Sequence, residues 1–267
     1  MINKNSNQIW KSISELGETL QKGYSVTDAT AIRKQYLVQV KQYPLYLKWF
    51  VKIEEAVNKQ DRQVSVLEYG SGPGLLAGKL VRNKNVKEYT AIEPEKIFRD
   101  MTRKESKDRA IVIDNTGEKY QKKNCYDVII ATATYHHLFD KPKTLKNFYD
   151  NLKDYGQLMI ADAFIPEYKF DKNYNPLDKA QFIENVLRYA SAQILAMPQA
   201  KEADIIDQIK AAFMDTLRVE ELKVCISILM KQLKLAGFKE IRSELMKGGN
   251  KKINYTNLGY YFITAKK

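Results

Sequence analysis

The sequence predicts an α/β fold, in which strands and helices alternate around a sheet whose strands run mostly parallel. Apolar runs of strand length recur along the chain, at residues 64–67, 88–93, 110–114, 126–131 and 157–164. Stretches with apolar residues at helical spacing separate most of them, and a glycine-rich turn follows the first run. This alternation is typical of a sheet with helices packed on its faces.

The glycine-rich turn is the most informative stretch of the chain. Gly70, Gly72 and Gly74 directly precede an apolar helical pattern over residues 75–81. Glycines let the backbone turn sharply and come close to a ligand, and the N-terminus of the next helix presents free N–H groups. The turn therefore predicts a site for a nucleotide-like ligand.

The acid before these glycines decides between two kinds of ligand. Residues 72–77 also fit the G-x-G-x-x-A string of dinucleotide sites. However, Glu68 is expected at the tip of the first strand, where a carboxylate would repel a pyrophosphate and attract a ligand that carries an amino group and a sulfonium. S-adenosylmethionine is such a ligand.

The run E-Y-G-S-G-P-G at residues 68–74 resembles the E/D-x-G-x-G-x-G signature of class I S-adenosylmethionine-dependent methyltransferases. The resemblance extends over about residues 60–165 and again from residue 218 to the end. It implies a Rossmann-like, seven-stranded methyltransferase sheet, mostly parallel with an antiparallel last strand. It also implies S-adenosylmethionine as the cofactor, with Glu68 and the three glycines among its contacts.

Further cofactor contacts are expected where the later strands end. Glu93 ends the second strand about 20 residues after the glycines, where a carboxylate can accept hydrogen bonds from both ribose hydroxyls; a helix-capping acid is the alternative. Pro94 then opens the next helix. For Asp114, followed by Asn115, the resemblance implies a contact with the adenine amino group, whereas an ordinary Asp-Asn turn is the alternative. Thr132, at the end of the fourth strand, is expected to contact the cofactor as well.

The chain has two histidines, His136 and His137, and they are adjacent just beyond the fourth strand. The run H-H-L-F-D at residues 136–140 resembles the H-H-L-P-D segment of small-molecule methyltransferases, with Phe139 in place of proline. We expect one of the two, His136 before His137, to face the transferred methyl group and to orient the acceptor or take its proton, because neutral imidazole suits that task near pH 7. The alternative is that the pair satisfies loop carbonyls and packs on Phe139.

The absence of three motifs limits the class of molecule that can be the methyl acceptor. The fourth strand is not followed by Asn/Asp-Pro-Pro-Tyr/Phe, and no Pro-Cys is present, so both nucleic-acid signatures fail. Asp162, at the end of the fifth strand, has no partner acid after the fourth strand, so no metal site is expected. A small-molecule acceptor is therefore favoured. The alternatives are an RNA or protein acceptor, and a non-catalytic nucleotide-binding protein of the same fold.

The predicted chain divides into four segments. They are an N-terminal helical segment (1–60), the cofactor-binding half (61–165), a helical cap (166–217), and a C-terminal helix and β-hairpin that complete the sheet (218–267). The cap follows the fifth strand, so it would cover a substrate at the carboxyl edge; a homodimer contact is the alternative. The N-terminal helices are expected to pack on the core, and the alternative is that one tyrosine among Tyr24, Tyr36, Tyr43 and Tyr46 lines the substrate pocket.

The composition favours a cytoplasmic protein without a membrane helix. The net charge is +12, from 44 Lys and Arg against 32 Asp and Glu, but the lysines are scattered and form no basic stripe. A solvated basic surface is therefore favoured over a nucleic-acid site. No apolar run approaches the ~18–20 residues of a membrane span, and the polar N-terminus lacks a signal-peptide core. Cys125 and Cys225 are far apart in the sequence and are expected to be reduced, buried thiols.

Overall fold

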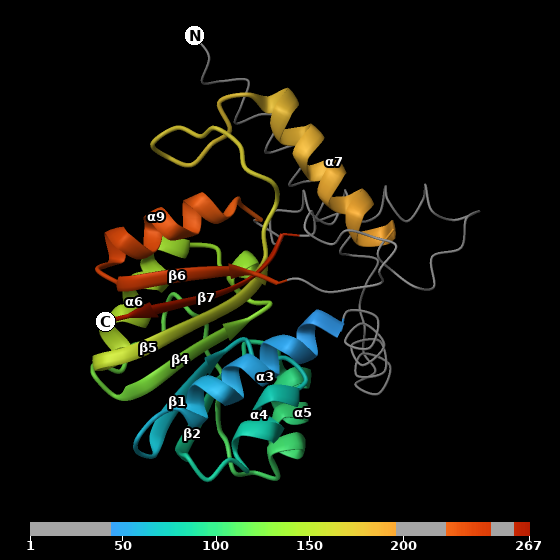
Figure 1. Cartoon of the computed structure of the whole chain (residues 1–267). Coiled ribbons are helices and arrows are strands. Elements are labelled where there is room, and N and C mark those ends of the chain that lie inside the picture. Colours follow the sequence, from blue (N-terminus) through green and yellow to red (C-terminus); the bar gives the residue numbers. More distant parts are fainter. Residues whose placement is uncertain (1–43, 196–222, 247–258) are drawn as a thin grey trace.

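A computed structural model describes residues 44–195, 223–246 and 259–267 of the chain (Figure 1). Its centre is a seven-stranded sheet in the order β3-β2-β1-β4-β5-β7-β6. The strands are β1 (Val64–Tyr69), β2 (Val86–Ile92), β3 (Ile111–Ile113), β4 (Tyr126–Thr132), β5 (Leu152–Ala163), β6 (Lys239–Leu245) and β7 (Tyr260–Lys266). Pairs among β1 to β5 are parallel, and β7 is antiparallel to both β5 and β6. The predicted sheet, with its antiparallel last strand, is confirmed.

Helices cover both faces of this sheet (Figure 1). On one face lie α3 (Pro44–Asn58), α4 (Leu75–Leu80) and α5 (Lys96–Ser106), and on the other lie α6 (Lys141–Asn151) and α9 (Ile226–Ala236). Because neighbouring residues of a strand point to opposite faces, Val66 packs with the α3 and α4 side, and Leu67 packs with the α6 and α9 side. Burial on both faces explains why the central strands read as unbroken apolar runs.

The boundary between α6 and β5 differs from the prediction, which ended the helix at residues 155–156 and began the strand at Gln157. The helix ends at Asn151, and β5 begins at Leu152. Asn151 is buried, its Oδ1 accepts from the backbone of Lys122 at 2.6 Å, and its carbonyl accepts from Cys125 N at 3.0 Å. These contacts tie the end of the helix to the entry of β4. The Tyr155-Gly156 pair is an irregularity inside β5, with Tyr155 at φ 64°, and not a helix stop.

In the sequence, Asp140 predicts the start of a helix and Gly237 the end of one, and both predictions are confirmed. Asp140 caps α6 by accepting a hydrogen bond from the backbone of Lys143 at 3.0 Å, and Gly237 ends α9 with φ 104°. The apolar pattern over residues 219–236 predicts a single helix, but residues 223–225 have no helical structure and α9 begins at Ile226. Here the carbonyl of Val224 accepts from the backbone N–H of Ile165 at 3.3 Å.

The predicted cap begins with α7 (Lys179–Leu195), which lies on the side of the sheet towards which the parallel strands run (Figure 1). Apolar residues at helical spacing also predict helices at 9–20, 25–43 and 205–213, and the two glycines at 248–249 predict a turn at 247–250. These predictions, like those for Tyr24, Tyr36 and Tyr43, lie outside the described residues. Tyr46 is half-buried and packs edge-on against Trp49, with ring centroids 4.9 Å apart. No helix in the described part of the chain is long and apolar enough to cross a membrane.

Candidate cofactor and acceptor site

The glycine-rich turn joins β1 to α4 in the middle of the sheet, where the strand order reverses and α/β folds bind ligands. Gly70, Gly72 and Gly74 have φ angles of 66°, 51° and 76°, a region that favours glycine. A Cβ on Gly70 would lie 2.4 Å from Thr134 Oγ1, and one on Gly74 would lie 2.6 Å from the Cα of Thr102. A Cβ on Gly72 would meet no described atom within 4 Å. Gly70 and Gly74 therefore allow the turn to pack on the protein, whereas Gly72 borders open space where a ligand can approach.

Two buried carboxyl groups flank this turn, and they belong to Glu68 on β1 and Glu93 after β2. Glu68 Oε2 accepts a hydrogen bond from the Tyr89 hydroxyl at 2.7 Å. Glu93 accepts from the backbone N–H of Gly72 at 2.9 Å and from that of Glu95 at 3.0 Å. Glu93 is thus in direct contact with the glycine turn, as its expected role requires.

The environment of these two groups disfavours their charged forms. Burial, with a contribution from nearby Glu93, raises the pKa of Glu68 from 4.5 to about 8, although the Tyr89 hydroxyl opposes the shift. Burial likewise raises the pKa of Glu93. Neither carboxyl group forms an ion pair with any described residue. The sequence argument treated Glu68 as an ionised carboxylate, but in the protein alone this group is mostly protonated at neutral pH.

A cationic ligand fits these residues. A positive charge near Glu68 and Glu93 would lower both pKa values and supply the partner that the described residues do not provide. At the end of β4, Thr132 adds a second feature, because its hydroxyl is buried and has no hydrogen-bond partner among the described residues. Buried polar atoms are rarely left without partners, so the hydroxyl is suited to a bound molecule.

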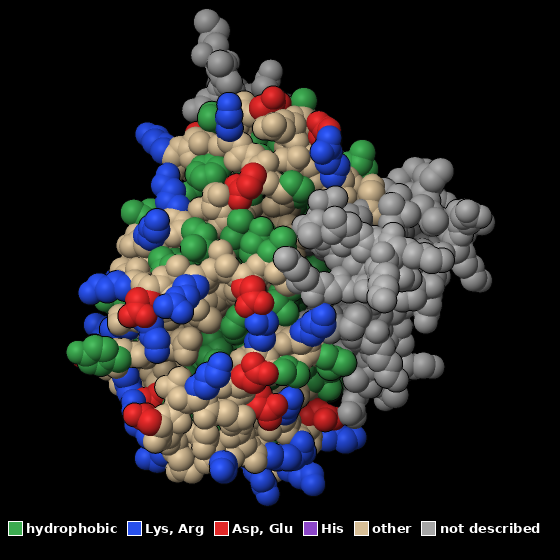
Figure 2. Space-filling view, viewed as in Figure 1, with side chains coloured by type: hydrophobic (Ala, Val, Ile, Leu, Met, Phe, Trp, Pro, Cys, Tyr) green, Lys and Arg blue, Asp and Glu red, His purple; other side chains and the backbone are tan. Residues whose placement is uncertain are grey.

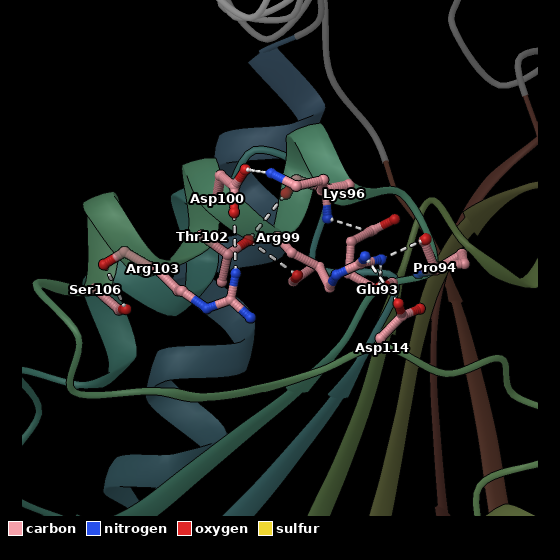
Figure 3. A network of polar contacts seen from close by, with 11 residues as sticks. Glu93, Pro94, Lys96, Arg99, Asp100, Thr102, Arg103, Ser106 and Asp114 are labelled. Atoms are coloured by element: carbon pink, nitrogen blue, oxygen red, sulfur yellow. Dashed lines mark hydrogen bonds and ion pairs between the residues drawn. The ribbon is translucent and has the colours of Figure 1, made fainter.

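The expected adenine-side residues form a different cluster, drawn in Figure 3. Arg99 Nη2 lies 2.8 Å from Asp114 Oδ2, and its Nη1 donates to the carbonyls of Glu93, at 3.0 Å, and of Pro94. Asn115 accepts a hydrogen bond from the backbone of Thr116 at 2.8 Å. The Asp114 side chain is 70% exposed, so a ligand can still reach it. Sequence reasoning missed Arg99, which fixes the chain between the strand ends at Glu93 and Asp114.

The loop after β4 connects the histidines to the glycine turn. Thr134 Oγ1 lies 3.3 Å from the carbonyl oxygen of Gly70 and 3.0 Å from that of Thr132. A short 3-10 helix, η1 (Tyr135–His137), follows directly. The histidines therefore lie at the same edge of the sheet as Gly70, Glu93 and Thr132, as predicted from the strand order.

His136 pairs with Asp162, which sequence reasoning considered only as half of a missing metal site. The ring Nδ1 of His136 lies 2.7 Å from Asp162 Oδ1, and the backbone N–H of His136 donates to Oδ2 at 3.1 Å. Both side chains are buried, His136 at 9% exposure and Asp162 at 1%. Burial alone would raise the pKa of Asp162, but His136 and the backbone N–H groups hold it below its usual value. The only signal in the sequence was the position of Asp162 at the end of a neighbouring strand.

His137 differs from His136, because it is exposed and its ring centroid lies 4.0 Å from that of His136. Phe139 is 77% exposed, so it offers little surface for packing. The loop carbonyls of His136 and Leu138 accept from Lys141 Nζ, at 3.3 Å and 2.8 Å. These carbonyls therefore accept hydrogen bonds from Lys141, whereas the alternative interpretation had them accept from the imidazole rings. The catalytic roles of both histidines stay predictions.

Comparisons with known proteins agree with this geometry. A family described as a methyltransferase domain matches residues 42–192, more than half of the chain. No curated protein sequence matches the chain.

Three solved structures illustrate the shared fold. A possible histamine N-methyltransferase of Thermotoga maritima is 17% identical with a TM-score of 0.52, and the match covers 90% of this chain and 100% of that one. An S-adenosylmethionine-dependent methyltransferase of Mesorhizobium loti is 11% identical with a TM-score of 0.54, and covers 81% and 96%. Phosphoethanolamine N-methyltransferase 2 of Haemonchus contortus, solved with S-adenosylmethionine, is 11% identical with a TM-score of 0.54; here the match covers 82% of this chain and 52% of that one. At these identities the likeness concerns the fold.

Proposed function

This chain belongs to the methyltransferase domain family and is an S-adenosylmethionine-dependent methyltransferase, and we propose that it methylates an oxygen, nitrogen or carbon atom of a small molecule. The observation that carries the proposal is the burial of His136 beside the glycine turn. An acceptor must enter the protein to reach this ring. A small molecule can do so without exposing the site to water, which is a condition for a well-aligned transfer.

The protein's own residues divide the work of holding the cofactor. Glu68 is suited to the positively charged end, Glu93 to the ribose hydroxyls, and the backbone at Gly72 to close approach. Thr132 offers a buried hydroxyl that has no hydrogen-bond partner in the described part of the chain. Bound S-adenosylmethionine would supply an electrophilic methyl group on a sulfonium. What the protein adds is position and the exclusion of water, and these can provide much of the rate.

Towards the adenine, Asp114 is the proposed acceptor of the amino group, flanked by Pro94 and Asn115. Arg99 holds Asp114 in place and also binds the carbonyl of Glu93 (Figure 3). The proposed ribose and adenine parts of the cofactor site are therefore linked by one guanidinium group.

The surface supports a small acceptor over a nucleic acid. In Figure 2, Lys and Arg side chains are dispersed over the visible face, with Asp and Glu side chains among them. Several of these charges form ion pairs, such as Lys52 with Glu244 and Arg188 with Glu184. A nucleic-acid site would gather basic side chains in one groove or stripe. α7 is the described part of the proposed cap and packs on the core through Phe182, Val186 and Tyr189.

Transfer of a labelled methyl group tests the proposal. The protein is incubated with methyl-labelled S-adenosylmethionine and, separately, with small amines and phenols, with total RNA, and with mixed proteins. Histamine and phosphoethanolamine are sensible first amines, since two structural neighbours are named for them. We expect label in a small molecule, and less label with Glu93→Ala as the control when S-adenosylmethionine is below saturation. Label that enters only RNA or protein would refute the small-molecule acceptor, and binding without any transfer would favour the non-catalytic alternative.

A further inference from the structure

Helix α5 contacts the glycine turn and the end of β2 through two buried side chains that lie one turn apart, Arg99 and Thr102 (Figure 3). The hydroxyl of Thr102 donates to the carbonyl of Gly72 at 2.9 Å. Nη1 of Arg99 donates to the carbonyl of Glu93 at 3.0 Å and also to the carbonyl of Pro94. Because these contacts come from one helix, they fix the glycine turn and the end of β2 relative to each other.

The guanidinium group of Arg99 also reaches the end of β3. Its Nη2 lies 2.8 Å from Asp114 Oδ2, and the Arg99 side chain is 11% exposed whereas that of Asp114 is 70% exposed. An exposed carboxylate on its own samples several orientations. Here it faces a planar group whose direction is already set by two backbone carbonyls. Among the described residues none donates a hydrogen bond to the other oxygen, Oδ1, so Arg99 holds one oxygen and leaves the other for a ligand.

The contact with Arg99 determines what the side chain of Asp114 can offer to a base. A guanidinium group only donates hydrogen bonds, so the atom that faces it must be an acceptor. Both oxygens of the carboxylate are acceptors, and the one left over can accept from the 6-amino group of adenine. It would repel the 6-oxo group of hypoxanthine, which is itself an acceptor. Hypoxanthine has a donor at N1, but the carboxylate cannot turn towards it without breaking the ion pair.

We propose that Arg99 is a positioning residue that gives the site its selectivity for adenine, because it fixes which atom of the side chain at position 114 faces the base. The inference rests on the proposed function, in which Asp114 accepts from the adenine amino group. Arg99 also holds the carbonyl of Glu93, the proposed ribose ligand, so the ribose and adenine contacts keep a fixed separation. The site therefore binds a 6-aminopurine nucleoside and rejects the corresponding 6-oxopurine nucleoside.

A pair of ligands tests this selectivity in the full chain without any methyl acceptor. S-inosylhomocysteine carries an oxo group where S-adenosylhomocysteine carries the 6-amino group. We expect the wild-type protein to bind S-adenosylhomocysteine at least about 10-fold more tightly in calorimetric titrations, because the other ligand loses a hydrogen bond to a charged acceptor and brings two acceptors together. Equal affinities would remove Asp114 from the adenine contact and overturn the proposal.

Asp114→Asn tests the role of Arg99 while Arg99 itself is unchanged. Since Arg99 only donates, it takes the amide oxygen and leaves the amide NH₂ group for the base. This group donates to a 6-oxo group and clashes with a 6-amino group, so we expect the preference to invert in favour of S-inosylhomocysteine. An amide that is free to flip would serve both ligands about equally. Equal binding, or a retained preference for S-adenosylhomocysteine, overturns the positioning role.

Arg99→Lys provides the second variant. A lysine keeps the positive charge but cannot make all three contacts of the guanidinium fork at once. We expect the preference for S-adenosylhomocysteine to fall about 10-fold, mainly through weaker binding of this ligand. Arg103→Lys is the matched control on the same helix, because Arg103 makes an exposed contact with Asp100, and it should leave both affinities unchanged. If Arg99→Lys weakens both ligands by the same factor, Arg99 only supports the fold and the proposal is wrong.

The two proposals fail in different ways. Equal binding of both ligands by Asp114→Asn overturns the role of Arg99 and leaves the small-molecule acceptor intact. Label that reaches only RNA or protein refutes the small-molecule acceptor, whereas the preference between the two homocysteine ligands is measured independently of any acceptor.

Discussion

Asp127 at the amino edge of the sheet and the two acids beside the glycine turn, Glu68 and Glu93, are buried with different kinds of partner. At the amino edge, Asp127 at the start of β4 is paired with Arg62 at 2.7 Å and Lys153 at 2.8 Å, and accepts from the backbone of Ser65 at 2.8 Å. Burial opposes ionisation there, but these partners hold the pKa of Asp127 below its usual value. At the carboxyl edge, Glu68 and Glu93 lack cationic partners among the described residues, and burial raises both pKa values.

The difference shows that the buried acid at the amino edge stabilises the fold, whereas the two acids beside the glycine turn lower its stability. A buried acid that is paired with cations, such as Asp127, destabilises the folded protein little. The contacts of Asp127 also join the starts of β1, β4 and β5. Buried acids without cations are unfavourable in the protein alone, and such groups are concentrated at functional sites. The carboxyl edge is therefore prepared for a positive charge that comes with a ligand.

The largest expected effect concerns the pH dependence of stability through Glu68. The folded protein binds a proton on Glu68 up to about pH 8, whereas the unfolded chain releases it near pH 4.5. The stabilisation is therefore complete below pH 4.5 and is lost as the pH rises through 8. We expect the free energy of unfolding of the ligand-free protein to fall by on the order of 3 kcal/mol between pH 5 and pH 8 from this group. Urea unfolding of Glu68→Gln should lack this decrease, and identical slopes in both proteins would contradict the assignment.

At the amino edge, Asp127→Ala should destabilise the protein without affecting the site. The change leaves the Ser65 N–H without its acceptor and removes both ion pairs, so we expect a loss of about 2–3 kcal/mol in the free energy of unfolding. Thermal and urea unfolding measure it. Asp100→Ala is the control, because the exposed contacts of Asp100 with Lys96 and Arg103 contribute little. A changed affinity of Asp127→Ala for S-adenosylmethionine would contradict the claim that the amino edge serves stability and the carboxyl edge serves binding.

In contrast to Asp127→Ala, Glu93→Ala should affect the cofactor site. We expect it to weaken S-adenosylmethionine binding by about 1–3 kcal/mol, the cost of losing hydrogen bonds to a charged acceptor. Equilibrium binding of S-adenosylmethionine measures it, with Glu95→Ala as the control, because Glu95 is exposed and contacts Glu93 only through its backbone. Equal affinities of the two variants would favour a helix-capping role for Glu93.

The smallest effect is expected at Asp114. If its carboxylate accepts from the adenine amino group, Asp114→Ala should weaken cofactor binding by about 0.5–1.5 kcal/mol, the scale of one hydrogen bond. Asn115→Ala is the neighbouring control. A loss of stability with an unchanged affinity would show that Asp114 serves only its ion pair with Arg99.

The features that the sequence predicted correctly are local ones. The glycine turn, the cap at Asp140 and the stop at Gly237 each depend on a few consecutive residues, and the strands were visible as apolar runs. Contacts between distant strand ends were not predictable. Asp162 reaches His136 through the register of the sheet, and Arg99 reaches Asp114 from α5 through the packing of that helix on the sheet. No periodicity reveals either contact. The protonated state of Glu68 was missed for a similar reason, because it depends on burial by residues far along the chain.

Calorimetric titration of S-adenosylmethionine tests the central claim, that Glu68 and Glu93 at the carboxyl edge obtain their cationic partner from the bound ligand. Carried out near pH 7.5 in two buffers of different ionisation enthalpy, it reports affinity and proton release together. We predict binding in the micromolar range, about 8 kcal/mol, with release of a proton that is absent in Glu68→Gln. Tight binding of NAD with none of S-adenosylmethionine, or binding of S-adenosylmethionine with equal proton exchange in both proteins, would contradict the account.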